Sequence, residues 1–161
     1  IKPHEVCLVP ERREELTTEG GLDVYSQFKV LSPMVARLRN AGIRVSMFID
    51  PEGSQIEASM ASGAEAVELH TGAYAACADQ NAAKSECSRI RDASRSAYDL
   101  WLKVNAGHGL HYQNVSWIAA IPEISELNIG HSIIAESVFV GLHKAVRTMK
   151  DLILDSAMGR L

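Results

Sequence analysis

The 161-residue sequence predicts an α/β fold built around a parallel sheet. Three observations lead to this prediction. Short apolar, β-rich segments alternate with longer helical segments, the predicted strands recur about every 30 residues, and glycines stand where helices give way to strands. Strand–helix repeats of this kind are typical of βα units, whose strands pair in parallel.

The predicted strands are short runs rich in β-branched and other apolar residues: EVCLV at 5–9, IRVSMFI at 43–49, AVEL at 66–69, LKVN at 102–105 and SELNI at 125–129. The segments between and after them predict helices at 27–41, 54–62, about 80–101, 115–119 and 132–157. Gly42 and Gly63 are placed as C-terminal caps of two of these helices. In the last segment apolar residues recur near helical spacing, and we expect Ser132 to be its N-cap.

The spacing of the strands is typical of a (β/α)8 TIM barrel, which needs about 250 residues for its eight units. We interpret residues 1–161 as a single domain that supplies about five of these units, strands four to eight. The chain starts at Ile1 with neither an initiator methionine nor a signal peptide, so we expect the first three units to be absent from it. A doubly wound open sheet is the alternative, and periodicity alone does not exclude it.

The composition of the chain limits the classes of partner that it is expected to bind. A formal charge of −4 argues against a general polyanion binder, so we expect no nucleic acid partner. No apolar run approaches the roughly 18–20 residues that span a bilayer, so we expect no membrane partner. Cys7, Cys77 and Cys87 are odd in number and lack CxxC spacing. They predict reduced thiols in a cytoplasmic protein and no structural zinc.

Polar and glycine-rich loops follow the predicted strands. The fourth strand leads into NAGHGL, with His108 between Gly107 and Gly109, and the fifth leads into NIGHS, with Gly130 and His131. Barrels often bind phosphate with the loops after strands seven and eight and a helix N-terminus, and the N–H groups of a glycine turn can surround an oxyanion. We therefore expect a phosphate group between these two loops. From composition alone, the two histidines are equally site residues or ordinary loop residues.

Five segments, in this order, resemble the pyridoxine 5′-phosphate synthase family: CLVPERREELTTEGGLDV, VSMFIDP, VELHTGAYA, VNAGHGLHYQNV and ELNIGHSII. The resemblance covers residues 2 to about 154. It implies a TIM barrel that assembles as a homo-octamer. It also implies an enzyme that joins 3-amino-2-oxopropyl phosphate to 1-deoxy-D-xylulose 5-phosphate, releasing phosphate and water, with no metal and no organic cofactor.

The resemblance also implies the site residues. His108 corresponds to a proton-donating histidine and Glu68 to a glutamate that stabilises charge, so both are expected to be catalytic. Thr17 corresponds to a contact with the deoxyxylulose phosphate, and contacts with the aminooxopropyl phosphate are implied for Gly109, Gly130 and His131. The chemistry moves protons near neutrality, where histidine titrates and a partly buried carboxylate can assist.

The chain departs from the family pattern in several places. The family's N-terminal third, with further general bases and phosphate-binding arginines, is absent, and His111 and Trp101 stand where other residues are expected. Glu68 as a salt-bridge partner and Thr17 as a loop or cap residue are the structural alternatives. If the chain truly begins at Ile1, the alternative function is a non-catalytic phosphate-binding partial barrel. An intact mass near 17.5 kDa would favour that alternative over the enzyme.

Overall fold

A five-stranded parallel sheet forms the centre of the protein, in a computed structural model that describes residues 2–10 and 20–159. The strands follow one another in chain order, and each pairs in parallel with the next. They are β1 (Glu5–Leu8), β2 (Arg44–Ile49), β3 (Ala66–His70), β4 (Lys103–Gly107) and β5 (Ile124–Asn128). The predicted α/β class, strand order and parallel pairing are confirmed.

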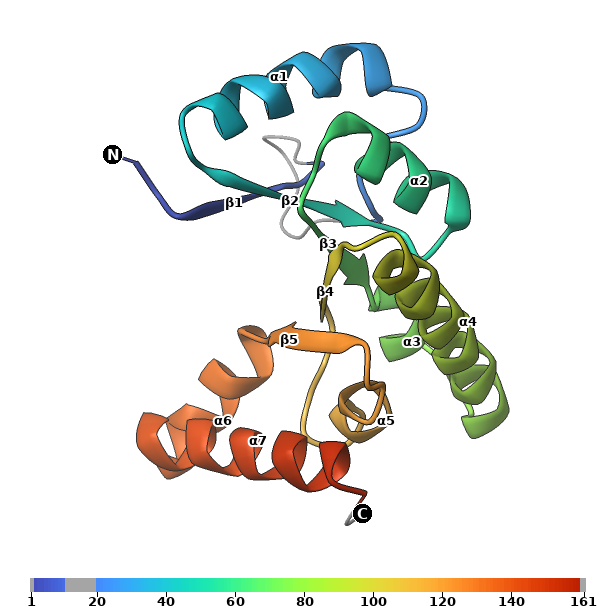
Figure 1. The fold of residues 1–161 in the computed structure, drawn as a ribbon. Helices are drawn as coiled ribbons and strands as arrows, with labels where there is room; N and C mark the ends of the chain where they lie inside the picture. Colours follow the sequence, from blue (N-terminus) through green and yellow to red (C-terminus); the bar gives the residue numbers. More distant parts are fainter. Residues whose placement is uncertain (1, 11–19, 160–161) are drawn as a thin grey trace.

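Helices follow each strand, and at least one helix after each of β1, β2, β3 and β4 packs against the sheet. They are α1 (Phe28–Asn40), α2 (Gly53–Ser62), α3 (Gly72–Ala75), α4 (Gln80–Asp99), α5 (Val115–Ala119), α6 (His131–Val140) and α7 (Leu142–Ala157). Figure 1 shows the strands along the inside of an arc and the long helices along its outside. This arrangement is consistent with part of a TIM-like barrel.

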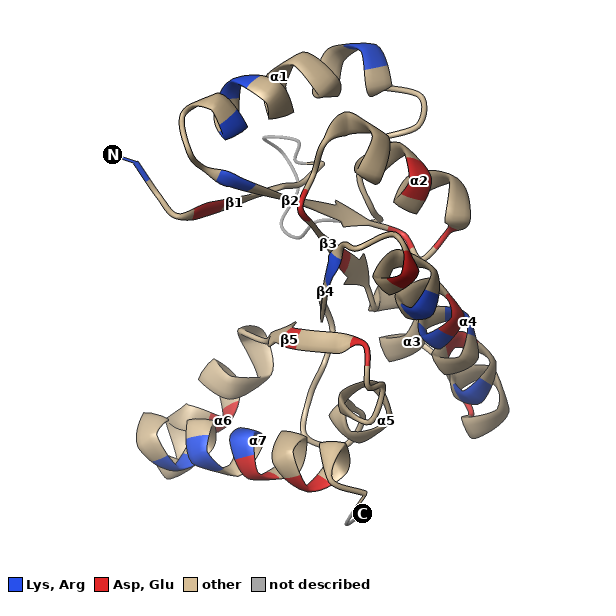
Figure 2. Cartoon of the chain, in the orientation of Figure 1, with Lys and Arg blue, Asp and Glu red and all other residues tan. Residues whose placement is uncertain are grey.

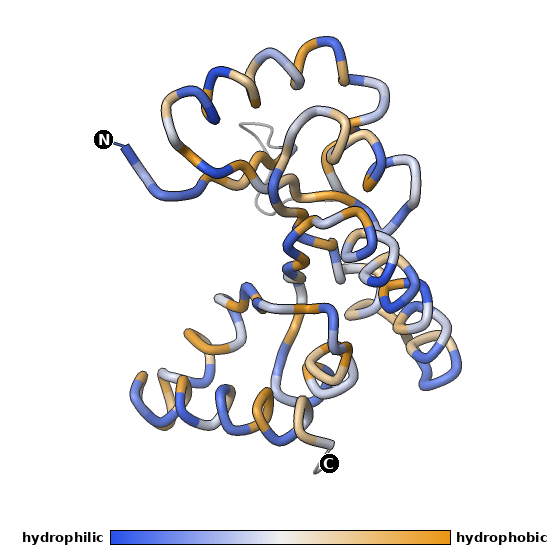
Figure 3. Tube along the Cα trace, in the orientation of Figure 1, coloured by the Kyte–Doolittle hydropathy of each residue, from blue (hydrophilic) through white to orange (hydrophobic). Residues whose placement is uncertain are grey.

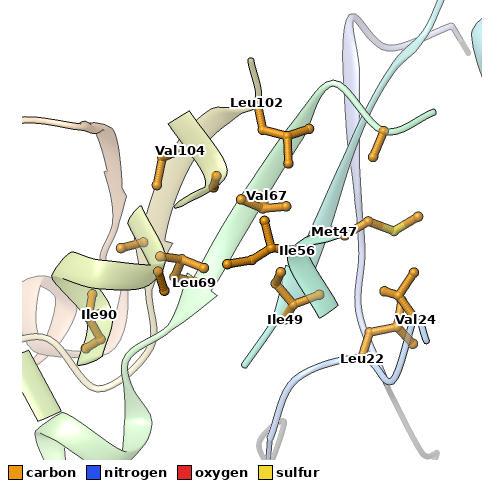
Figure 4. Packing of buried hydrophobic residues seen from close by; sticks show 14 of the residues in the cluster. Leu22, Val24, Met47, Ile49, Ile56, Val67, Leu69, Ile90, Leu102 and Val104 are labelled. Atoms are coloured by element: carbon orange, nitrogen blue, oxygen red, sulfur yellow. The ribbon is translucent and has the colours of Figure 1, made fainter. Parts of the chain in front are cut away.

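The core lies between the sheet and its helices. Alternate residues of each strand point toward the helices, because successive side chains of a strand face opposite ways. Met47, Val67 and Val104 are almost completely buried there and pack with Ile56 of α2 and Ile90 of α4 (Figure 4). Hydrophobic residues accordingly recur along β2 and β3 (Figure 3). The intervening strand residues, among them Glu68, face the inside of the arc.

Most predicted bounds agree with the structure to within two residues, but the last helix was predicted wrongly as one segment. Gly141 interrupts it with φ +84° and ψ 146°, so α6 ends at Val140 and α7 begins at Leu142. The apolar periodicity continues across the break and hides it.

The single turn α3 was not predicted. Ser132 is not the N-cap either: Gly130 takes that place, and the Ser132 hydroxyl donates to the Leu110 carbonyl at 2.9 Å.

Helix α6 leaves its apolar side uncovered by the described residues. None of its residues is buried, and Ile134, Val138 and Phe139 are 59%, 79% and 85% exposed. Figure 2 shows that the helix carries almost no charge. None of the helices in the described part of the chain is both long and apolar enough to cross a membrane.

Three helices that lead into strands end in the same hydrogen-bonded turn. After α1, α2 and α4, two backbone N–H groups reach back to the last turn, as in the Schellman motif. The motif needs a residue with positive φ just beyond the helix, which Gly42 (+72°) and Gly63 (+91°) supply. After α4 that residue is Trp101, with φ +63° and a side chain 95% exposed. A bulky residue in this conformation is strained.

We therefore expect Trp101→Gly to stabilise the fold, because glycine relieves the backbone strain and the exposed indole contributes little packing. The free energy of unfolding, measured in urea, should rise by about 1 kcal/mol. Trp101→Ala is the matched control, since it removes the indole but keeps the Cβ that causes the strain. An equal gain in both variants would show that the indole, and not the backbone, is responsible.

Candidate active site

A cavity of about 700 Å³ opens inside the arc at the carboxyl ends of the strands. Five predicted site residues line it together: Glu68, His108, Gly109, Gly130 and His131. Glu68 comes from β3, His108, Gly109 and Gly130 come from the loops after β4 and β5, and His131 is the first residue of α6. The sixth, Thr17, lies outside the described residues. Cavities of this size are typical of small-molecule sites.

The Glu68 carboxylate is held by a hydrogen bond that crosses β4. Asn128 Nδ2, at the end of β5, donates to Glu68 Oε2 at 2.7 Å, and β4 lies between their two strands. The residue beneath this bond is Gly107. A Cβ built at Gly107 would collide with Glu68 Oε1 and would lie 3.0 Å from the Asn128 carbonyl oxygen. Glycine at this position therefore leaves the room that the carboxylate occupies.

Desolvation raises the pKa of this carboxyl group and of a neighbouring thiol. Desolvation raises the pKa of Glu68, although hydrogen bonds from Asn128 and Cys7 act in the opposite direction. Cys7 of β1 is exposed by its surface area, but its thiol lies 3.7 Å from Glu68 Oε2. Desolvation of the thiol and the negative charge of Glu68 raise the pKa of Cys7 to about 12. Cys7 is thus a neutral thiol near neutral pH and donates to the carboxylate. A raised pKa suits a carboxyl group that assists proton transfer.

The backbone of His108 is held in an unusual conformation. Its φ is +84°, a region that non-glycine residues seldom adopt, and Gly109 follows with φ +75°. The buried Thr71 hydroxyl lies 2.8 Å from the Gly107 carbonyl oxygen and 2.6 Å from that of His108, and shares its proton between them. Thr71 N–H also donates to Gly107 at 2.9 Å. These bonds stabilise the turn that presents His108 to the cavity.

The imidazole of His108 lies against two other rings. Its centroid is 4.9 Å from that of His70 and 6.3 Å from that of Phe48. Burial lowers the pKa of His108, and the nearby His70 and His131 lower it further. His108 is therefore neutral near neutral pH, and its imidazolium, when it forms, is a stronger acid than ordinary histidine.

The loops after β4 and β5 are tied together at the mouth of the cavity. The Ser132 hydroxyl joins the first turn of α6 to Leu110 of the β4 loop. Within the β4 loop, Asn114 Nδ2 donates to the Gly109 carbonyl at 3.2 Å. Gly130 differs from Gly107 because a Cβ there would meet no protein atom within 4 Å. The fold itself does not need a glycine at position 130. Its open backbone faces the cavity, at the N-terminus of a ten-residue helix.

Sequence reasoning missed several residues that shape this site: Cys7, Phe48, Asp50, His70, Thr71 and Asn128. The sequence held a signal for only one of them, His70. Glu68 and His70 are two residues apart on one strand, so they share a face, and Asn128 is the register partner of Gly107. The period of the strands could have placed His70, but the partnership of Asn128 required the register.

Gly107→Ala should weaken the fold and the site together, because the new methyl group must displace the Glu68 carboxylate or the strand end. Overpacking of this kind costs about 1–3 kcal/mol of unfolding free energy, measurable in urea. Gly53→Ala is the matched control, since a Cβ at Gly53 meets nothing within 4 Å. Equal stability of the two variants would show that the Glu68–Asn128 bond does not depend on the missing side chain.

Two comparisons with known proteins identify the family of the chain. A family model described as pyridoxal phosphate biosynthesis protein PdxJ matches residues 1–155. A curated pyridoxine 5′-phosphate synthase from Photobacterium profundum is 55% identical over 155 residues, which are 96% of this chain and 64% of that relative. The chain thus spans somewhat less than two thirds of the relative it matches. It belongs to the pyridoxal phosphate biosynthesis protein PdxJ family.

Proposed function

We propose that the protein is a pyridoxine 5′-phosphate synthase, a transferase that condenses 3-amino-2-oxopropyl phosphate with 1-deoxy-D-xylulose 5-phosphate. The observation that carries the proposal is the convergence of Glu68, His108, Gly109, Gly130 and His131 on one cavity. These residues come from three separate segments, and the sequence resemblance assigns them to one active site independently of the geometry. The family membership and the name of the curated relative support the same activity.

Phosphate recognition is assigned to the loops after β4 and β5. The N-terminus of α6 offers unpaired N–H groups and the positive end of the helix dipole. Gly130 leaves its backbone open to a ligand, and His131 adds a ring nitrogen at the same mouth. Gly109 extends this surface from the other loop. We assign the phosphate of the aminooxopropyl substrate to this position and, with Thr17, the deoxyxylulose phosphate to the neighbouring one.

Proton transfer is assigned to His108, and stabilisation of developing charge is assigned to Glu68. Imine formation, phosphate elimination and dehydration each require protons to move to and from oxygen and carbon. His108, with its lowered pKa, donates a proton readily to a departing oxygen and is then neutral and able to accept another. The Glu68 carboxylate, fixed by Asn128, lies where it can stabilise positive charge on an iminium intermediate.

The whole protein is needed for this activity, and several further properties belong to the proposal. We assign β1–β5 to strands four to eight of an eight-stranded barrel, forming a single domain with three preceding units. Two sheet edges, at β1 and β5, are available for those units among the described strands. The proposal also includes a cytoplasmic homo-octamer that works without metal or organic cofactor.

His108→Asn in the full-length protein should lower kcat about 10²- to 10⁴-fold, the usual contribution of general acid–base catalysis, while substrate binding changes little. The assay follows formation of pyridoxine 5′-phosphate and release of phosphate from the two substrates. His143→Asn, on the exposed side of α7, is the matched control. A wild-type protein that binds both substrates without turnover would support the non-catalytic alternative and contradict the enzyme.

Gly130→Val should weaken binding of the aminooxopropyl phosphate more than binding of the deoxyxylulose phosphate. The protein has space for the new side chain, so the fold should persist while the anion loses its access to the backbone. Calorimetry with each substrate separately measures the two affinities, and thermal unfolding checks the fold. Equal losses for the two substrates would mean that the phosphates have been assigned to the wrong positions.

A further inference from the structure

A second histidine stands behind His108 and takes no part in the proposed chemistry. His70 is the last residue of β3, and its side chain is only 11% exposed. Its Nδ1 lies 2.9 Å from Asp50 Oδ1, just beyond β2. Because a carboxylate can only accept, Nδ1 carries the hydrogen and donates it to Asp50. Nε2 is buried and has no hydrogen-bond partner among the described residues.

The two imidazoles meet above Gly72. A Cβ built at Gly72 would lie 2.5 Å from His70 Nε2 and 3.2 Å from His108 Cδ2, so both rings occupy the space that a side chain would need. Phe48 packs on the same pair, with its centroid 5.1 Å from that of His70. The next residue after His70, Thr71, binds the backbone of His108. The end of β3 thus contacts both the backbone and the ring of His108.

His108 differs from the usual catalytic histidine in how its ring is oriented. Such rings are commonly fixed by a hydrogen bond to a carboxylate or a carbonyl group. Within residues 2–10 and 20–159, no hydrogen bond to a ring nitrogen of His108 is found, and its ring contacts are with His70 and Phe48. In this site the nearby carboxylate, that of Asp50, binds His70, and the His70 ring in turn contacts the His108 ring.

We propose that His70, fixed by Asp50, is a positioning residue that sets the orientation of the His108 ring for proton transfer. The inference rests on the proposed function for its kinetic consequence, but the ring geometry can be tested without it. Asp50 limits the rotation of His70, and His70 limits the rotation of His108. Loss of either restraint leaves His108 in place on its Thr71-bound backbone with a less well-oriented ring.

The electrostatic influence of His70 on His108 supports the same role. Titratable groups that surround His108 are His70 and Glu68 from β3, His131 from α6, and His111 and Cys7 on the cavity wall. Among these, His70 and His131 lower the pKa of His108 after burial itself. Removing the imidazole of His70 should therefore raise the pKa of His108, because a group that repels its protonated form is lost and the site becomes more hydrated.

The experiment compares three variants of the full-length protein. His70→Asn keeps a donor near the position of Nδ1 but removes the ring, Asp50→Ala releases His70, and Asp50→Asn keeps an acceptor oxygen for it. We expect His70→Asn and Asp50→Ala to lower kcat roughly 10- to 100-fold with KM nearly unchanged, as for misplacement of a reacting group. Asp50→Asn should recover much of the lost kcat. His143→Asn is the control and should match the wild type.

Nuclear magnetic resonance titration of the His108 ring provides a readout that does not require activity. In His70→Asn the pKa of His108 should rise and its ring proton shifts should change, while His143→Asn leaves both unaltered. Identical titration and shifts in wild type and His70→Asn would overturn the positioning role, as would unchanged kcat per folded molecule in both His70→Asn and Asp50→Ala. A wild-type protein without synthase activity would contradict the proposed function alone, because the titration still tests the contact.

Discussion

The absence of a side chain at Gly107 is the constraint on which the site depends. Glu68 and Asn128 belong to strands on either side of β4, and their hydrogen bond passes over the one position of β4 that leaves room for it. The parallel register fixes this meeting, because it sets His70 beside Gly107 and Gly107 beside Asn128. Gly107 also ends β4, and its carbonyl accepts hydrogen bonds from Thr71. This one glycine therefore leaves space for the Glu68 carboxylate and stabilises the turn at His108.

The sequence was sufficient to predict the order and direction of the strands. Apolar runs spaced by helix-length segments leave little choice but βα units, and Gly42 and Gly63 mark the helix ends by the conformation they permit. The division of the last helix was not predictable from its apolar pattern, since a single glycine can be tolerated inside a helix. Only its backbone angles show that Gly141 has left the helical region.

The sequence predicted the site residues that lie close together in the chain. It did not predict the partners that the pairing of the strands brings together. His108, Gly109, Gly130 and His131 belong to short glycine-containing strings, which local sequence and family resemblance both single out. The partners that hold the site come from elsewhere: Asn128 lies 60 residues from Glu68, and Asp50 lies 20 residues from His70. Such pairs depend on register and on the alternation of strand faces, which no local pattern encodes.

The position of α6 couples ligand binding in the cavity to burial of the exposed apolar side of this helix. Within the described residues, α6 packs against α7 but has no buried side chain, so little buried surface opposes its local opening. Its N-terminus nevertheless faces the cavity at Gly130. A ligand at that end and a protein surface over Ile134, Val138 and Phe139 both favour the same folded helix. By thermodynamic linkage, covering the helix strengthens ligand binding, and ligand binding strengthens the contact with the covering surface by the same factor.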